Sequence, residues 1–397
     1  MEKLEIIIIG AGMYVCGKGT TGHGTILPAI YESKRLNENI GNVHCVSTSL
    51  ESSQNLLKKS DELGKKTGVA LDIKAYPDSE EKNHIAYKEI LKNLKRPACA
   101  IIAVPDHLHY QIAKDCLESG IHVLMVKPLT PTYAEGAELT KIASKSNLHA
   151  AVEFHKRWDK SNLILRDKFK SGELGTPLNC WVEYSQRKSI PISSFKEWAS
   201  NTSILQYLGV HYIDIIRFIT GAVPIQVMAI GQKSEIVKHG VDTYDSIQCM
   251  VKWKLSDRTE FSQTLLTSWV DPESSTAMSD QKIKFIGTRG RYEADQKERG
   301  IRVNTDKFGV EHINPDFCMP YGDKEGNIRW RGYGIESITT FINDVLSLNK
   351  KSINLSSLRN KRPSFEESLI STAVVEAAHT SLDNDSTWQT INKRYDF

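Results

Sequence analysis

The feature that most constrains the fold is an apolar segment that ends in a lysine. Residues Ile121 to Pro128 read IHVLMVKP, and Gly120 precedes them. An almost unbroken apolar run of this length is typical of a strand that is buried on both faces, as in a parallel sheet. Ligands of open α/β sheets bind at the carboxyl ends of the strands, where Lys127 lies. Lys127 is therefore a candidate to hydrogen-bond a substrate oxygen; the alternative is a solvated lysine that only ends the strand.

The first 150 residues alternate between strand-like and helix-like segments. The expected strands are Leu4 to Ile9, Asn42 to Val46, Ala98 to Val104, Ile121 to Pro128 and Ala150 to Phe154. Helical segments are expected from Ile26 onward, from about Gln111 to Ser119 and from about Tyr133 to Ser146. This alternation is typical of an α/β fold with a doubly wound parallel sheet. A chain of 397 residues is too long for one ordinary core, so we expect two domains, 1–150 and 151–397.

A glycine-rich turn follows the first strand. Gly10-Ala11-Gly12 comes where a dinucleotide fold offers backbone N–H groups to a pyrophosphate. The match to G-x-G-x-x-G is incomplete, because Val15 stands at the third glycine and a longer glycine-rich loop runs to Gly24. This loop is either an extended phosphate-binding turn or only a flexible connection.

The second strand ends in Ser47-Thr48-Ser49, without an acidic residue. A carboxylate at this point would bind the ribose 2′-hydroxyl of NAD and disfavour the 2′-phosphate of NADP. Its absence leads us to expect NADP or NAD as cofactor, with NADP slightly preferred. No arginine follows closely to bind a 2′-phosphate, and Lys58 and Lys59 lie on the next helix. The alternative is a serine-rich turn that contacts no ligand.

The second half of the chain has the pattern of a sheet that is covered on one face. Apolar and polar residues alternate from Ile247 to Leu255, the period of such a sheet. The other expected strands are Leu178 to Tyr184, Ile225 to Ile230, Thr259 to Leu266 and Lys282 to Ile286, and the expected helices are Lys160 to Lys170, Ile335 to Leu348 and Phe365 to Leu382. A large sheet with an apolar open side favours a homo-oligomer, either a dimer or a tetramer.

Composition excludes several classes of partner. The net charge is +3, from 51 basic and 48 acidic residues without a basic block, so we expect no nucleic acid. The longest apolar runs are far shorter than a bilayer span, and the N-terminus begins directly with a strand, so we expect a cytoplasmic protein without membrane contact. Seven cysteines without a CxxC pair favour reduced thiols. His107 and His109 have a metal-binding spacing but no evident third ligand, so no metal is expected.

Several motifs together resemble one known family. GAG after the first strand, VPDHLH, the Lys-Pro of MVKPLT, EFHKRWD, KSGELGTP and LGVHYIDIIRFITG are similar in order and spacing to the Gfo/Idh/MocA family of glucose-fructose oxidoreductases and inositol dehydrogenases. The resemblance covers nearly the whole chain and weakens after about residue 230. It implies a Rossmann domain at 1–150 and, at 151–397, an α/β domain with a large, mostly antiparallel open sheet for substrate binding and oligomerisation.

The resemblance also assigns roles to individual residues. Lys127 matches the lysine of the family's Glu-Lys-Pro, with Val126 in place of the glutamate; Tyr207 and His211 match its Asp-x-Gly-x-His, with a tyrosine in place of the aspartate. The implied cofactor site consists of Gly10, Gly12, Met13, Ser47, Thr48, Val104, Pro105, His109, Lys127, Pro128 and His155. The implied substrate site consists of Lys127, His155, Arg157, Tyr184, Tyr207 and His211.

These assignments predict an NAD(P)-dependent oxidoreductase that interconverts a ketone and a secondary alcohol on a sugar-like substrate, free or nucleotide-linked. Lys127 would polarise the reacting oxygen, Tyr207 would exchange its proton, and His211 would position the hydroxyls. The alternative is a non-catalytic family member that binds a dinucleotide or a sugar as a sensor or scaffold. The loss of both acidic residues motivates this alternative.

Overall fold

The computed structural model describes residues 2–79, 85–359 and 361–391. The chain forms two compact units, which are described separately. The first unit consists of Met1–Leu129, Ala134–Trp158 and Asp316–Ser368, and the second of Thr130–Tyr133, Asp159–Pro315 and Leu369–Phe397. A division of the chain at residue 150 assigns 316–368 to the second domain, whereas these residues pack with the first unit.

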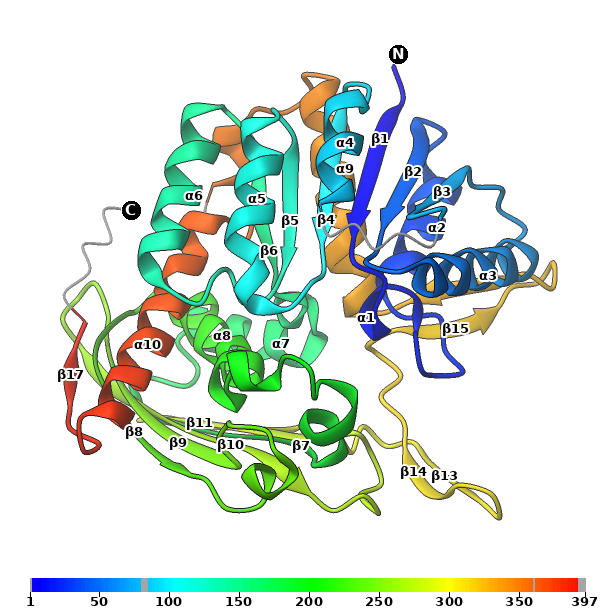
Figure 1. The fold of residues 1–397 in the computed structure, drawn as a ribbon. Coiled ribbons are helices and arrows are strands. Elements are labelled where there is room, and N and C mark those ends of the chain that lie inside the picture. Colours follow the sequence, from blue (N-terminus) through cyan, green and yellow to red (C-terminus); the bar gives the residue numbers. More distant parts are fainter. Residues whose placement is uncertain (1, 80–84, 360, 392–397) are drawn as a thin grey trace. The chain divides into compact units, whose positions relative to one another are not determined.

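The first unit contains a six-stranded parallel sheet (Figure 1). Its strands are β1 (Leu4–Ile9), β2 (Ile40–Val46), β3 (Ile73–Tyr76), β4 (Ala98–Ile102), β5 (His122–Val126) and β6 (Ala150–Glu153), in the order β3-β2-β1-β4-β5-β6. All neighbouring strands are parallel. This is the strand order of a dinucleotide-binding fold, with the crevice for ligands at the carboxyl ends of the strands. The predicted α/β class and doubly wound sheet are confirmed.

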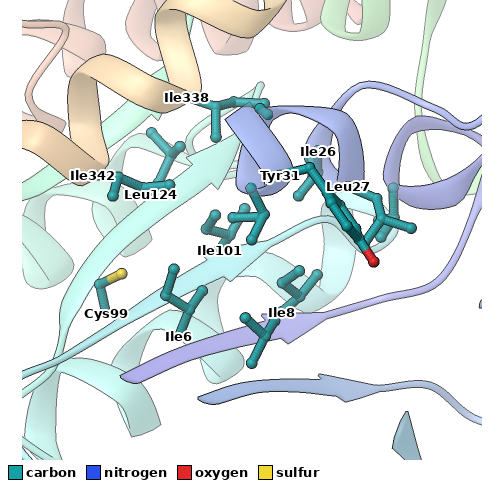
Figure 2. Close-up of a cluster of buried hydrophobic side chains, with 14 of the residues drawn as sticks. Ile6, Ile8, Ile26, Leu27, Tyr31, Cys99, Ile101, Leu124, Ile338 and Ile342 are labelled. Atoms are coloured by element: carbon teal, nitrogen blue, oxygen red, sulfur yellow. The ribbon is translucent and has the colours of Figure 1, made fainter. Parts of the chain in front are cut away.

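Helices cover both faces of this sheet because its strands are apolar on both sides. One face packs against α2 (Ile26–Leu36), α3 (Leu50–Thr67) and α9 (Tyr333–Asn349). Figure 2 shows the resulting core, in which Ile338 and Ile342 of α9 lie over Leu124 of β5. Helix α9 therefore completes the first unit, although more than 170 residues separate it from β6.

The opposite face carries α4 (Ala86–Asn93), α5 (His109–Glu118) and α6 (Tyr133–Lys145). The Tyr87 hydroxyl of α4 donates to Asp115 of α5 at 2.6 Å. Lys114 of α5 pairs with Glu138 of α6 at 2.7 Å. Polar contacts thus join the three helices to one another, while their apolar sides cover the strands.

The second unit contains a seven-stranded sheet in the order β12-β11-β7-β10-β9-β8-β17. Its strands are β7 (Pro177–Arg187), β8 (Val223–Gln232), β9 (Ser246–Lys254), β10 (Glu260–Asp271), β11 (Ser279–Gly287), β12 (Arg291–Asp295) and β17 (Gln389–Thr390). Only the β10–β7 pair is parallel among these described strands. The buried residues of β9 alternate with exposed ones, as predicted, so one face of the sheet is covered.

The remaining elements of the second unit are α7 (Lys160–Lys170), α8 (Val210–Thr220), most of α10 (Phe365–Asp383) and a hairpin of β13 (Arg302–Thr305) and β14 (Gly309–His312). The first unit has a hairpin of β15 (Met319–Gly322) and β16 (Ile328–Arg331) and a one-turn helix, α1 (Met13–Cys16). Across the described parts of the chain, no helix is both long and apolar enough to span a bilayer.

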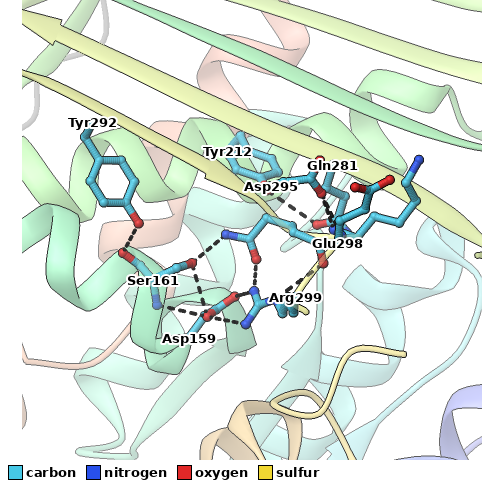
Figure 3. A network of polar contacts seen from close by, with 10 residues as sticks. Asp159, Ser161, Tyr212, Gln281, Tyr292, Asp295, Glu298 and Arg299 are labelled. Atoms are coloured by element: carbon cyan, nitrogen blue, oxygen red, sulfur yellow. Dashed lines mark hydrogen bonds and ion pairs between the residues drawn. The ribbon is translucent and has the colours of Figure 1, made fainter. Parts of the chain in front are cut away.

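A buried ion pair fixes the start of α7. Asp159 is fully buried, accepts a hydrogen bond from the Ser161 backbone N–H at 3.1 Å, and pairs with Arg299 (Figure 3). The Tyr292 hydroxyl donates to the Ser161 carbonyl at 2.8 Å, and Gln296 donates to the Ser161 hydroxyl at 2.6 Å. A buried charge needs such partners, so this network joins the start of α7 to β12 and to the residues that follow it.

The turn after β1 requires glycine at its first position. Gly10 has a φ of +115°, and a Cβ atom there would lie 2.1 Å from the Ala103 carbonyl oxygen. Gly12, in contrast, has a φ of −83°, and a Cβ atom there would meet no atom within 4 Å. Gly10 is therefore needed for packing, whereas Gly12 leaves open space in front of the turn.

Gly10→Ala should destabilise the protein by roughly 3 kcal/mol or more, because it adds backbone strain to a backbone clash. Gly12→Ala is the matched control and should change the free energy of unfolding by less than about 0.5 kcal/mol. Urea unfolding of both variants measures the difference. Equal stability of the two variants would contradict the assigned role of Gly10.

Candidate active site

Lys127 follows the last residue of β5 and is buried. Burial lowers the pKa of its ammonium group to about 8, while the charges of Asp106 and Glu153 act in the opposite direction. Asp106 begins the 3₁₀ turn that follows β4, and Glu153 is the last residue of β6. Strands β4 and β6 flank β5, so the sheet brings a lysine and two carboxylates together at one edge. A lysine with this pKa can change its protonation state near neutral pH.

His109 ties the loops after β4 and β5 to each other. Its Nδ1 lies 2.9 Å from the Pro128 carbonyl oxygen and 3.3 Å from that of Leu129, and its Nε2 lies 3.0 Å from the Val104 carbonyl oxygen. Both ring nitrogens thus face the protein's own backbone. The geometry gives His109 a positioning role beside Lys127–Pro128, in addition to the cofactor contact that the family resemblance implies.

His155 lies in a pocket of aromatic side chains after β6. Its ring centroid is 5.6 Å from that of Tyr333, 5.3 Å from that of Phe317 and 6.3 Å from that of Tyr14. The Nδ1 atom is 3.0 Å from Glu153 Oε2 and 3.4 Å from the Tyr14 hydroxyl. Burial and the neighbouring Glu153 raise the pKa of Tyr14 well above its usual value, so its hydroxyl stays protonated.

The glycine-rich loop is a defined structure. Gly17 and Gly24 have positive φ angles, and a Cβ atom on either one would lie within 3 Å of backbone atoms. Lys59 of α3 holds the loop by donating to the carbonyl oxygens of Thr20 and Gly22, at 3.2 and 2.7 Å. The loop separates the one-turn helix α1, which begins with Met13, from the long helix α2.

The end of β2 has a lysine nearby that sequence reasoning missed. The Lys18 ammonium, from the glycine-rich loop, donates to the Ser52 hydroxyl of α3 at 2.7 Å. Ser49 caps α3, and Thr48 is exposed beside it. The Ser47 hydroxyl is engaged within the protein, at 2.9 Å from the Ser49 carbonyl oxygen. Lys18 and Thr48 are therefore two of the described groups near this strand end that can face a ligand.

Two observations support a dinucleotide cofactor site in the first unit. The space in front of Gly12 is open, and Lys18 with the first turn of α3 offers positive charge at the end of β2. Val104 and Pro105 form the connection from β4 to the Asp106 turn. These residues would hold a dinucleotide along the carboxyl edge of the sheet.

Tyr207 and His211 belong to the second unit. Tyr207 lies in a π-helical turn, Leu205–Gly209, and His211 lies in the first turn of α8. A π-bulge, a feature that is frequent at functional sites, therefore interrupts the α-helical geometry between these two residues. The Tyr207 ring packs against those of Phe195, Trp198 and Trp269, with centroids 5.2, 6.0 and 5.7 Å away.

Two further predicted substrate ligands have contacts within their own units. Arg157 is buried, with Nη2 3.9 Å from Glu367 Oε2 in the first unit. Tyr184 is buried in the second unit and packs edge-on against Tyr212, with ring centroids 5.7 Å apart. Burial raises the pKa of Tyr184. Arg157 is thus held by an ion pair and Tyr184 by packing, and a substrate-positioning role requires side chains that are fixed in this way.

Within the part of the chain that the structure describes, no group of three or more His, Cys, Asp or Glu side chains could hold a metal ion. His107 is exposed, and His109 faces backbone carbonyl oxygens. All seven cysteines are free thiols, and six of them are buried.

Sequence reasoning missed Asp106, Glu153, Tyr14 and Lys18 at this edge. Glu153 has a sequence signal, because it is a carboxylate inside the otherwise apolar strand AAVEF. A charged residue in a buried strand needs a partner, and Lys127 is the nearest basic residue in the preceding strand segment. Lys18 has no comparable signal, since nothing in a glycine-rich loop specifies where its side chains reach.

Two models of one protein family match the chain. The model of an oxidoreductase family with an NAD-binding Rossmann fold matches residues 4–154, and that of the GFO/IDH/MocA C-terminal domain matches residues 163–293. Together they cover more than half of the 397 residues.

Curated relatives match over part of their length. The scyllo-inositol 2-dehydrogenase (NADP(+)) IolW of Bacillus subtilis is 29% identical over 168 residues, which are 41% of this chain and 46% of that protein. The levoglucosan dehydrogenase of Pseudarthrobacter phenanthrenivorans is 29% identical over 125 residues, 30% of this chain and 32% of that protein. The matched stretch thus spans less than half of each relative.

Solved structures match over the whole chain. The scyllo-inositol dehydrogenase of Lactobacillus casei with bound NAD(H) and scyllo-inositol has a TM-score of 0.69 at 16% identity, covering 99% of this chain and 100% of that one. The myo-inositol 2-dehydrogenase of Lactobacillus plantarum has a TM-score of 0.68 at 17% identity, covering 98% and 100%. These similarities show a shared fold. With the two family models, they confirm the resemblance seen in the motifs: the chain belongs to the Gfo/Idh/MocA family of oxidoreductases.

Proposed function

We propose that this protein is an NAD(P)-dependent dehydrogenase that interconverts a secondary alcohol and a ketone on an inositol-like or other sugar-derived substrate. The observation that carries the proposal is Lys127, buried at the carboxyl end of β5 with a pKa of about 8 beside Asp106 and Glu153. Relatives that are inositol and levoglucosan dehydrogenases support the choice of a polyol or sugar.

The reaction moves a hydride, which carries two electrons, and one separate proton. When bound, the nicotinamide cofactor accepts or supplies the hydride at the carbinol carbon. The Lys127 ammonium donates a hydrogen bond to the reacting oxygen and stabilises the negative charge that develops there during reduction. Tyr207 supplies the proton to that oxygen, and in the oxidative direction receives it. His211, with Arg157, Tyr184 and His155, positions the other hydroxyl groups of the substrate.

The test of this function is nicotinamide absorbance with a panel of inositols, sugars and ketosugars. Steady oxidation or reduction of the cofactor with at least one of them is expected. A non-catalytic sensor or scaffold is the second candidate, favoured by valine and tyrosine at the positions of the two family carboxylates, Val126 and Tyr207. Cofactor binding without turnover across the panel would favour that second candidate.

Lys127→Ala should lower turnover by roughly a hundredfold or more, the scale of losing an electrostatic or proton-transfer group. Cofactor affinity and the melting temperature should change little. In the wild type, the ammonium form is present below the pKa of about 8. The kcat/KM of ketone reduction should therefore be level below that pH and fall about tenfold for each pH unit above it.

Lys127→Arg is the control for this pH dependence. A guanidinium group stays charged, so residual reduction by this variant should show no fall near pH 8. Steady-state kinetics over a pH series measures both effects. Full turnover in Lys127→Ala would contradict the central role of the lysine.

Tyr207→Phe removes only the hydroxyl group and keeps the ring that packs against Phe195, Trp198 and Trp269. Cofactor binding and stability should persist, while turnover should fall by roughly ten- to ten-thousandfold, up to the span of general acid catalysis. Single-turnover kinetics with saturating cofactor is the measurement. Full activity would make the tyrosine a packing residue and leave His211 or Lys127 as the proton donor.

We further propose that NADP binds at least as well as NAD, because Lys18 places positive charge at the end of β2 and the strand end Ser47-Thr48-Ser49 carries no carboxylate. Lys18→Glu should weaken NADPH binding by about tenfold or more and affect NADH much less. Thr48→Asp should shift the preference in the same direction. Fluorescence titration with both reduced cofactors gives the dissociation constants.

Lys65→Glu on α3, the helix that Lys18 contacts through Ser52, is the charge-matched control, since Lys65 is exposed and pairs with Asp61 in the last turns of α3. Its cofactor preference should match that of the wild type. Equal loss of both cofactors in Lys18→Glu, or clear discrimination against NADPH by the wild type, would refute the role of Lys18.

A further inference from the structure

Glu153 is the cross-strand neighbour of the residue that precedes Lys127. Strands β5 and β6 are parallel, and Glu153 pairs directly with Val126 in their register. Neighbouring strands lie about 4.8 Å apart, and directly paired residues point to the same face of a sheet. Val126 packs against the core beneath α2 and α9, and Glu153 contacts Ser337 of α9. The Glu153 carboxylate therefore lies on the side of the sheet that a side chain at position 126 occupies.

Glu153 is held firmly and is almost fully buried, with 1% of its surface exposed. The Ser337 hydroxyl donates to its Oε1 at 2.5 Å, and His155 Nδ1 lies 3.0 Å from its Oε2. Burying a carboxylate is unfavourable unless partners compensate its charge. Ser337 is a neutral donor, and His155 adds a positive charge only when it is protonated. Lys127, which follows the cross-strand partner of Glu153, is a cation whose charged form the Glu153 carboxylate favours.

We propose that Glu153 is the positioning residue for Lys127, a carboxylate on β6 that keeps the neighbouring lysine charged and directed toward the reacting oxygen. The proposal rests on the proposed function, in which Lys127 contacts that oxygen. It gives β6 the electrostatic role that a glutamate at position 126 of β5 would have. His155 and Tyr14 in turn orient Glu153 from the side of the glycine-rich turn.

Other titratable groups surround this pair, and their ionisation contributes to any pH profile of activity. Among the described residues they are Asp106 in the turn after β4, His109 at the start of α5, Tyr14 on α1, His155 after β6, Cys318 and Tyr333. The pH at which Lys127 titrates must therefore be measured at Lys127 itself and not taken from activity alone.

The test is the ionisation of Lys127 in the protein without cofactor, followed through the NMR shift of its side-chain nitrogen. Glu153→Gln keeps the size of the side chain and an acceptor for Ser337 but removes the charge. The titration midpoint of Lys127 should fall by about one pH unit, because a nearby opposite charge is lost. The pH above which ketone reduction declines should move down equally, with cofactor affinity unchanged. A midpoint equal to that of the wild type overturns the proposal.

Ser337→Ala is the control for a purely structural role. It removes the hydrogen bond between α9 and Glu153 and leaves the carboxylate in place. The melting temperature should therefore fall, while the titration midpoint of Lys127 stays near the wild-type value. A midpoint that falls as far as in Glu153→Gln would mean that the hydrogen bond from Ser337, and not the charge of Glu153, sets the ionisation of Lys127. This result would also overturn the proposal.

Val126→Glu provides a second measurement that keeps Glu153, in case Glu153→Gln does not fold. A carboxylate at position 126 should raise the Lys127 midpoint, and in the double variant V126E/E153Q it should restore the midpoint toward the wild-type value. An unchanged midpoint in Val126→Glu contradicts the proposal. Because these titrations need no turnover, a failure of the proposed dehydrogenase activity would show separately, as absent cofactor reduction with an intact Lys127–Glu153 coupling.

Discussion

Burial of the Lys127 ammonium group is the constraint on which the rest of the candidate site depends. Removing a charge from water is unfavourable, and it lowers the pKa of this lysine from 10.5 to about 8. The negative charges of Asp106 and Glu153 oppose this lowering of the pKa, so the lysine stays largely protonated at neutral pH. The parallel sheet makes this arrangement possible, because the carboxyl ends of β4, β5 and β6 lie next to one another.

The segment that contains α9 links this edge of the sheet to a distant part of the chain. Ile338 and Ile342 of α9 pack on the sheet core, and Ser337 of the same helix fixes Glu153. Phe317 and Tyr333 then form the aromatic surroundings of His155. The core and the polar contacts of the first unit therefore require residues 316–349, so closing a loop of more than 150 residues is part of folding this unit.

Much of the fold could be predicted, because apolar runs and periodicity report which faces are buried. The bounds of β1 and α7 agree with the predicted Leu4 to Ile9 and Lys160 to Lys170. Periodicity does not report which neighbour covers a face, so it could not place α9 on the parallel sheet. It also does not give strand register, which pairs Glu153 with Val126, or the π-bulge that changes the spacing of Tyr207 and His211. Lys18 was missed because its position depends on glycine torsions and on Lys59, not on any pattern of residue types.

The claim that this fold carries a working dehydrogenase can be tested by following the hydride itself. The purified protein would be incubated with oxidised cofactor and a panel of inositols and sugars that carry deuterium on their carbinol carbons, and the reduced cofactor would be analysed by mass spectrometry. Transfer of deuterium from at least one substrate to the nicotinamide ring is the predicted result. Tight cofactor binding without label in the nicotinamide for any member of the panel would contradict catalysis on such substrates and indicate a binding protein.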